Sequence, residues 1–305
     1  MKIIGENIHI ISKKTREAIE NKDEKYIIEL AQKQLKNVDW IDLNIGPARY
    51  KEGTMKWLLE ILEPVCDKPF SFDTTNFSEM KSALEIVKNP SECIINSTNA
   101  DDERLDKLTS LAAEFDSFLI GLTLSEGGIP KTADERYELA AKIIETALEK
   151  GVSEEKIIID PLVLPIGVAQ EQALEAFDTI RMTKEAFDPP VLSVVGLSNI
   201  SNGSPKEIRP LINRIFAVLA AGCGLTSAIA DGCDEELVKM NKILQTSSAK
   251  TPSDKLILDL YEMMQNYGQL EDVEYNKKDE TSVHIYKTAQ ILLNKKIYSH
   301  SYLEI

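Results

Sequence analysis

Short apolar runs and longer amphipathic stretches alternate along this chain about every 30–40 residues, the length of one strand–helix unit. Most of the runs are continuous rather than alternating, as in Ile157-Ile158-Ile159. Continuous apolar runs are typical of parallel strands that are covered on both faces. We therefore predict eight parallel strands, at residues 3–8, 40–45, 70–74, 93–97, 118–124, 156–162, 191–197 and 227–230.

The stretches between these strands carry the signals of helix ends. Asn76 with Glu79, and Thr132 with Glu135, have the spacing of capping boxes, in which each side chain bonds the other residue's backbone amide. Gly151 is expected to end the helix that begins after Thr132, because glycine readily takes up the left-handed conformation found there. The pattern thus predicts a helix after most of the strands.

Eight such units in about 240 residues predict a (β/α)8 TIM barrel, with residues 1–305 as a single domain. A doubly wound sheet is the alternative, but it usually has fewer strands, and no G-x-G-x-x-G motif follows the first strand. Residues 246–280 are predicted as a helical insertion that is too short to be a domain. The last helix, at residues 281–293, is expected to close the barrel.

Each predicted strand ends at or near a polar residue. In a barrel the carboxyl ends of all strands meet at one mouth, so these side chains are expected to converge. They are Asn7, Asn44, Asp73, Asn96, Thr123, Asp160, Asn199 and Asp231. The pattern predicts one pocket that is lined by acids and amides and that suits a small heterocycle with many hydrogen-bonding groups.

The composition limits the class of partner. The 305 residues include 50 acidic and 35 basic side chains, which gives a net charge of −15. Nucleic acid and anionic membranes bind proteins through Lys and Arg, so both are disfavoured. No stretch approaches the ~20 apolar residues of a spanning helix, and the start reaches Glu6 too early for a signal peptide. We expect a cytoplasmic enzyme.

Metal and thiol chemistry find little support. The chain has only three histidines, and its four cysteines form no C-x-x-C pair. These counts disfavour a Cys–His metal site, an iron–sulfur cluster and a catalytic triad, and we expect no bound metal. The thiols are expected to be reduced and buried or half-buried. An all-oxygen magnesium site of Asp73, Asp160 and Asp231 stays open as an alternative.

The acids and amides at the strand ends suit a pterin ring. One edge of that ring presents N–H donors beside acceptors, while Asp accepts two donors and Asn donates and accepts at once. Each such pairing left unmade in a partly buried pocket costs about 1–3 kcal/mol, so a matched set is selective. At any single position the alternative stays open that the residue only caps a strand or a helix.

Eight short segments carry a family resemblance. They are Ile41-Asp42-Leu43-Asn44-Ile45-Gly46-Pro47, Ile94-Ile95-Asn96-Ser97-Thr98-Asn99-Ala100, Gly121-Leu122-Thr123, Gly127-Gly128-Ile129-Pro130-Lys131, Asp160-Pro161-Leu162, Gly196-Leu197-Ser198-Asn199, Arg209-Pro210-Leu211-Ile212-Asn213-Arg214 and Ala228-Ile229-Ala230-Asp231. Together they resemble the methyltetrahydrofolate:corrinoid protein methyltransferases. The resemblance covers roughly residues 1–234 and the final helix, and it is specific only as a set.

The resemblance implies roles for individual residues at the strand ends. Asp73, Asn96 and Asp160 match the family's contacts to the pterin ring. Asn199 matches the family's catalytic asparagine, which hydrogen-bonds the pterin near N5.

The loop after the seventh strand carries the other matches. Gly196 and Ser198 would shape this loop. Asn202 stands where the acetogen enzyme of the family has Gln, and Arg209 matches a family arginine after two extra residues. The resemblance therefore implies that Asn202 and Arg209 also contact the substrate.

The implied activity is methyl transfer between N5 of tetrahydrofolate and the cobalt of a corrinoid, with methyltetrahydrofolate as donor or product. No segment of the sequence is recognisable as a cobalamin-binding module, so the corrinoid is expected on a separate corrinoid-binding protein. The direction of transfer stays open, because one site serves both directions. The resemblance also implies a homodimer, which a monomer mass from light scattering would contradict.

Two other functions stay open. A dihydropteroate synthase-like enzyme shares the barrel and the pterin pocket, but it would need basic residues for pyrophosphate, and few stand at the strand ends. A non-catalytic folate-binding subunit of a methyltransferase complex would bind methyltetrahydrofolate without transferring its methyl group.

Overall fold

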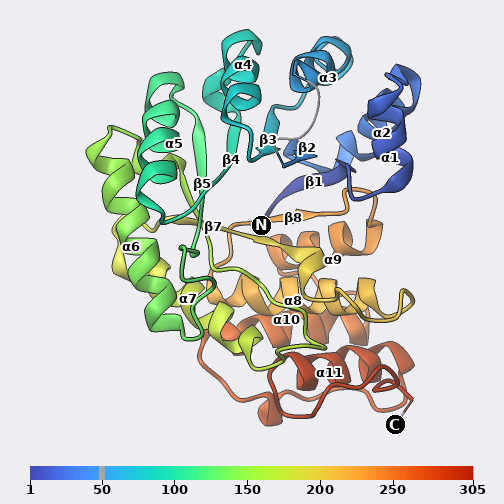
Figure 1. The fold of residues 1–305 in the computed structure, drawn as a ribbon. Helices are drawn as coiled ribbons and strands as arrows, with labels where there is room; N and C mark the ends of the chain where they lie inside the picture. The colour runs from blue at the N-terminus through green and yellow to red at the C-terminus, as the bar shows by residue number, and fades with distance from the viewer. Residues whose placement is uncertain (48–51, 305) are drawn as a thin grey trace.

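The structure, a computed structural model, describes residues 1–47 and 52–304 and shows a closed barrel of parallel strands in sequence order (Figure 1). The strands are β1 (Lys2–His9), β2 (Trp40–Gly46), β3 (Phe70–Thr74), β4 (Ile94–Thr98), β5 (Phe118–Leu122), β6 (Ile157–Asp160), β7 (Leu192–Gly196) and β8 (Ser227–Ala230). Pairing of β1 with β8 closes the ring. The predicted (β/α)8 barrel is confirmed, and each strand overlaps its predicted run.

Helices surround the barrel (Figure 1). They are α1 (Lys13–Glu20), α2 (Glu24–Gln34), α3 (Thr54–Leu62), α4 (Phe77–Ile86), α5 (Asp102–Phe115), α6 (Ala133–Glu149), α7 (Gln172–Ala186), α8 (Arg209–Cys223), α9 (Glu235–Thr246), α10 (Pro252–Gln265) and α11 (Glu280–Leu292). Short 3-10 turns are η1 (Leu35–Asn37), η2 (Pro90–Glu92), η3 (Glu154–Lys156), η4 (Leu197–Asn199) and η5 (Leu270–Asp272). Within the described residues, no helix is long and apolar enough to cross a membrane.

Two apolar layers hold the barrel together. Successive side chains of a strand point to opposite faces, so continuous apolar runs supply both layers. A larger layer packs the strands against the helices and includes Leu43, Phe72 and Ile95. The interior layer comprises Ile4, Trp40, Ile94, Ile120, Ile158 and Val194. It fills the barrel near the amino ends of the strands and leaves the carboxyl ends for polar side chains.

The end signals predicted for α6 are confirmed. The Thr132 hydroxyl accepts a hydrogen bond from the Glu135 amide at 3.3 Å, and the Glu135 carboxylate accepts one from the Thr132 amide at 3.3 Å. This is a complete capping box. After the helix, Gly151 takes a φ of +91°, in the left-handed region.

The capping box predicted at Asn76 is wrong. The Asn76 side chain does cap α4, because it accepts the amide of Glu79 at 3.3 Å. However, the Glu79 carboxylate is buried and accepts the amides of Gly53 and Met55 at the start of α3. A carboxylate stabilises the amino end of a helix, and here α4 supplies the carboxylate that caps the amino end of α3.

The ring of helices is closed by α9, which corrects the expectation that the last helix closes it. Asn241 of α9 donates its side-chain amide to the carbonyl of Met1 at 2.7 Å, next to β1. Lys36 of η1 pairs with Glu235 of α9 at 3.1 Å. The helices α10 and α11 pack on α8 and on each other, as an outer layer (Figure 1). Within residues 246–280, which were predicted as a helical insertion, the structure places α10 and η5.

As a consequence, α8 is covered on two sides. Buried residues occupy positions all round this helix, from Ile212 to Cys223, which is typical of a helix enclosed by protein. Gly222 lets α10 approach closely: a Cβ atom there would lie 2.5 Å from the Tyr261 carbonyl oxygen and 2.6 Å from Met264 Cβ. Residues 246–280 therefore thicken the wall beside α8.

All four cysteines are free thiols. Cys93 and Cys223 are buried and Cys66 is partly buried, as predicted. Cys233 is exposed, which corrects the expectation for that residue. It lies in the turn between β8 and α9, where the chain returns to the surface of the barrel.

Candidate functional site

Asp73 and Asn96 lie side by side at the carboxyl ends of β3 and β4, where they are partners in the strand register. Asn44 of β2 faces Asp73 from the other side and donates its side-chain amide to the Asp73 carboxylate. The buried Asn96 amide lies 3.4 Å from Asp42 and 3.5 Å from Ser71. Three adjacent strands thus contribute one polar network to the mouth of the barrel.

Asp160 reaches the same mouth from β6. Its side chain is 6% exposed and accepts the Leu162 amide at 2.8 Å. The loop after β6 is fixed by Arg136, whose fully buried guanidinium donates to the carbonyls of Pro161 and Leu162 at 3.1 Å each. The sequence analysis missed Arg136, because an arginine within an amphipathic helix carries no sign that it will be buried.

Burial changes the charge state of these acids. It raises the pKa of Asp160 to about 7, against the opposing effects of the Leu162 amide and Arg136. Burial also raises the pKa of Asp73 to about 7, while the hydrogen bond from Asn44 acts in the opposite direction. Burial, with the nearby Asp73, raises the pKa of Asp42 well above its ordinary value. Near neutral pH the site therefore holds protonated and ionised carboxyls and can both donate and accept.

The loop after β7 presents Asn199. A Cβ atom at Gly196 would lie 2.8 Å from Asn199 Nδ2, so the glycine leaves the space that this side chain occupies. Asn199 is exposed, and its side-chain amide makes no hydrogen bond to residues 1–47 or 52–304. Ser198 beside it donates its hydroxyl to Glu6 at 3.0 Å. The amide of Asn199 is thus open to the mouth, on a loop tied to β1.

Glu6 is a site residue that the sequence analysis missed. Burial raises its pKa to about 7, while the Ser198 hydrogen bond acts in the opposite direction and Asp231 adds to the increase. Next to it, Asn7 donates to Asp231 at 2.6 Å and so joins β1 to β8. The available signal was an acid in the middle of a predicted strand that packs into the barrel.

Asn202 and Arg209 are not joined to the strand-end acids by any hydrogen bond or ion pair among the described residues. Asn202 is exposed, and its backbone amide donates to the Asn199 carbonyl at 3.1 Å. Arg209 begins α8, and its Nε donates to the Ser204 carbonyl at 2.7 Å within its own loop. Both residues shape the loop that carries Asn199.

No group of three or more His, Cys, Asp or Glu side chains in residues 1–47 and 52–304 is arranged to hold a metal ion. The acids at the mouth are paired with amides instead, as in Asn44 with Asp73 and Asn7 with Asp231. Acids and amides in this arrangement recognise N–H and C=O groups on a ring edge.

A closed (β/α)8 barrel with buried acids and amides at its carboxyl-end mouth defines a TIM-barrel protein that binds a small polar ring. Comparison with known families agrees with this class. The chain belongs to the pterin binding enzyme family, whose sequence model matches residues 12–231. The predicted family resemblance is confirmed.

Two relatives extend the match. The methylcorrinoid:tetrahydrofolate methyltransferase of Eubacterium limosum is 28% identical over 242 residues, which cover 78% of this chain and 88% of the relative. The methionine synthase of Mycobacterium tuberculosis is 30% identical over 254 residues, 79% of this chain. The chain matches only 21% of that long protein. It is therefore a pterin-binding TIM barrel that is homologous to one-carbon transferases.

Solved structures share the fold. Dihydropteroate synthase of Xanthomonas albilineans with 4-aminobenzoic acid has a TM-score of 0.59 at 16% identity and covers 82% of this chain and 94% of its own. Dihydropteroate synthase of Anaplasma phagocytophilum with bound 6-hydroxymethylpterin-monophosphate has a TM-score of 0.56 at 17% identity. The match covers 81% of this chain and 99% of that synthase chain. At these identities the likeness establishes the fold alone.

Proposed function

We propose that this protein transfers a methyl group between N5 of tetrahydrofolate and the cobalt of a corrinoid carried by a separate protein. The observation that carries the proposal is the match to the Eubacterium limosum methyltransferase over 88% of that protein's length. The described polar groups at the mouth agree with it, because they are acids and amides that can form hydrogen bonds to the edge of a pterin ring.

The ring is proposed to bind at the ends of β3, β4 and β6. Asp73 and Asp160 accept hydrogen bonds from N–H groups on the edge of the pterin ring. The side-chain amide of Asn96 donates one hydrogen bond to the ring and accepts another from it. The buried position of Asn96 and Asp160, each at most 6% exposed, makes every unmatched group costly. A ring without this donor and acceptor pattern is therefore rejected.

The chemical step exchanges two bonds at the methyl carbon. In transfer to cobalt, the electron pair of Co(I) forms the Co–C bond, the C–N5 bond breaks, and N5 takes up a proton. In the opposite direction N5 attacks the methyl carbon, the Co–C pair returns to cobalt, and N5 loses a proton. An uncharged tertiary amine is a poor leaving group, so positive charge at N5 lowers the barrier.

Asn199 is proposed to stabilise the protonated N5 through its side-chain carbonyl oxygen. A neutral amide costs less to desolvate than a carboxylate, and a fixed dipole aimed at developing charge is effective in a partly closed site. Glu6 acts through Ser198 as a positioning residue, because their 3.0 Å hydrogen bond fixes the residue next to Asn199. Positioning the methyl group against cobalt supplies the rest of the rate enhancement.

The test is an anaerobic assay of purified protein with methyltetrahydrofolate and photoreduced cob(I)alamin. Loss of the Co(I) absorption band and formation of methylcobalamin are expected. Measurable folate binding with no transfer, either to free cobalamin or to a corrinoid protein, would instead identify a binding subunit. Absence of folate binding would reject the pterin site altogether.

The dihydropteroate synthase-like reaction is the competing hypothesis. Solved synthases share only the fold with this chain, at 16% and 17% identity for the two described above. Formation of dihydropteroate from the dihydropterin pyrophosphate and 4-aminobenzoate, with release of pyrophosphate and in place of methyl transfer, would favour that reaction. The same protein preparation serves both assays.

A further inference from the structure

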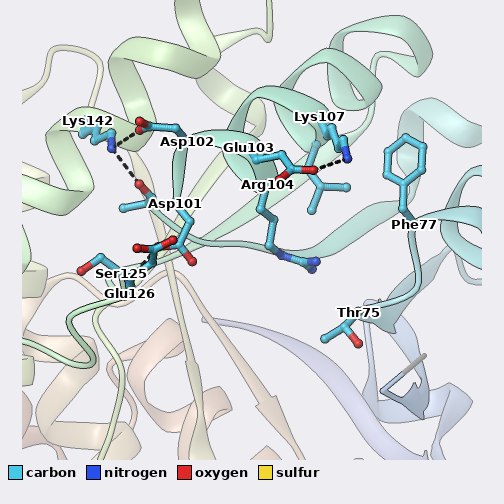
Figure 2. Close-up of a pocket in the computed structure, with 12 residues that line it drawn as sticks. Thr75, Phe77, Asp101, Asp102, Glu103, Arg104, Lys107, Ser125, Glu126 and Lys142 are labelled. Carbon is cyan, nitrogen blue, oxygen red and sulfur yellow. Dashed lines mark hydrogen bonds and ion pairs between the residues drawn. The ribbon is translucent and has the colours of Figure 1, made fainter. Parts of the chain in front are cut away.

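A cavity of about 780 Å³ opens between the amino ends of α4 and α5 and the loop after β5 (Figure 2). Thr75 and Phe77 line one side, Ser125 and Glu126 line the other, and Arg104 stands between them. These segments follow the carboxyl ends of β3, β4 and β5, so the cavity adjoins the mouth site. Its volume is that of a pocket for a small organic molecule.

Arg104 is fixed beside the proposed ring site. Its Nε donates to the Ser97 carbonyl at 3.1 Å, and Nη2 donates to the same oxygen. Ser97 follows Asn96, so the guanidinium lies one residue along the strand from a proposed ring contact. Figure 2 shows the guanidinium pointing into the cavity. Its Nη1 makes no hydrogen bond to any described residue, which leaves the Nη1–Nη2 edge open for a ligand.

The two lysines of this wall are already paired with acids. Lys107 pairs with Glu103 at 2.6 Å, and Lys142 pairs with Asp102 at 2.6 Å (Figure 2). Asp101 accepts the Glu126 amide at 2.7 Å and the Asn99 side-chain amide at 2.6 Å. Arg104 is therefore the cation lining this cavity that has no carboxylate at ion-pair distance among residues 1–47 and 52–304.

An aromatic surface accompanies this cation. Phe77 begins α4 and is 40% exposed, although a side chain of its size gains free energy from burial. A partly buried guanidinium with a free edge binds carboxylates bidentately. The two groups together suit a ligand that joins an aromatic ring to a carboxylate.

We propose that Arg104 binds a glutamate carboxylate of the folate side chain, while Phe77 contacts the aminobenzoyl ring of the same side chain. This inference rests on the proposed function, since it takes the pterin ring to lie at Asp73 and Asn96. The side chain then leaves the ring over the end of β4 and lies in the cavity beside α5. The site would thus recognise folates rather than pterins in general.

The test compares two ligands by anaerobic titration calorimetry: 5-methyltetrahydrofolate, and 5,6-dimethyltetrahydropterin, which lacks the aminobenzoylglutamate side chain. Arg104→Gln should raise the Kd for the folate roughly tenfold or more, the effect of losing one charge-assisted hydrogen-bonded pair. The Kd for the pterin should not change. Arg104→Lys, which keeps the charge but not the fork, should recover part of the affinity.

Lys107→Gln is the matched control, because Lys107 lines the same cavity but is paired with Glu103. It should leave both Kd values unchanged. An equal loss of affinity for both ligands in Arg104→Gln would show that Arg104 only supports the end of β4, and no loss for either would also overturn the inference. If wild-type protein binds neither ligand, it is the proposed function that fails.

Discussion

Asn199 is placed by the glycine three residues before it in the chain. The amide nitrogen occupies the space where a Cβ of residue 196 would stand, 2.8 Å away. A methyl group added at residue 196 would therefore displace the Asn199 side chain without changing any polar group. The side chain proposed to handle charge at N5 is thus sensitive to the backbone of its own loop.

We expect Asn199→Ala to lower turnover of methyl transfer by about 10²-fold or more, as for loss of one preorganised contact in a transition state. Gly196→Ala should lower turnover in the same direction, because it displaces the Asn199 amide. Stopped-flow absorbance of cob(I)alamin measures both variants. Melting temperatures serve as the control for folding. Wild-type turnover in Asn199→Ala would remove this residue from the mechanism.

Asp160 makes the stability of the fold depend on pH. Its folded pKa of about 7 lies above the ordinary value of 3.8, because burial disfavours the ionised form. The contribution is fully present below about pH 4 and is lost as the pH rises through about 7. Asp160→Asn, which cannot ionise, should therefore reduce the loss of stability between pH 5 and pH 8.

Urea unfolding of wild type and Asp160→Asn at the two pH values checks this expectation. The full shift corresponds to about 4 kcal/mol for this one group in wild type, of which about 3 kcal/mol is lost between pH 5 and pH 8. Equal pH dependence in both proteins would mean that Asp160 is ionised in the folded state at pH 5.

At the scale of elements, neighbouring helices depend on each other for their ends. The buried carboxylate of Glu79 in α4 accepts the first amides of α3, from Gly53 and Met55. These amides have no partner within their own helix. The βα unit is therefore not independent of the next one along the ring.

We expect Glu79→Ala to lower the free energy of unfolding by about 2–3 kcal/mol, because it leaves the buried Met55 amide and the Gly53 amide without their hydrogen-bond acceptor. Glu85→Ala is the control, since Glu85 is an exposed acid on the same helix, and it should cost little. Chemical denaturation measures both. Similar effects of the two substitutions would contradict the capping role of Glu79.

At the scale of the whole molecule, the mouth carries apolar side chains that no core residue covers. Ile11 after β1 is 82% exposed and Val168 after β6 is 83% exposed. A protein partner that docks over the carboxyl ends of the strands would meet these loops. The proposed corrinoid protein has to bring its cobalt to this end.

We expect Val168→Asp to slow methyl exchange with the corrinoid protein by about fivefold or more, the effect of losing roughly 1 kcal/mol at an interface. Exchange with free cobalamin should not change, because Val168 is not part of the proposed ring site. Ile86→Asp is the control, as Ile86 is an exposed residue at the far end of α4. Equal slowing with free cobalamin would mean that the substitution disturbs the site itself.

The strands, the barrel and the polar residues at the mouth could all be predicted from local patterns in the chain. Apolar runs such as Ile157-Ile158-Ile159 are local patterns that indicate parallel strands covered on both faces. Eight such strands, each followed by a helix, predict a closed barrel with the strands in sequence order. Asp73, Asn96 and Asp160 could be placed together because the carboxyl ends of the strands meet. The family was also recognisable, since short segments carry it.

Features that depend on contacts between residues far apart in the chain are visible only in the folded protein. Glu6 meets Ser198 across 192 positions of the chain, and Arg136 reaches the loop of Asp160. The burial that raises the pKa values of the acids is likewise a property of the assembled barrel. Local patterns hold no information about which partner a long polar side chain will find, so the cap from Glu79, the closing helix α9 and the free edge of Arg104 appear only in the fold.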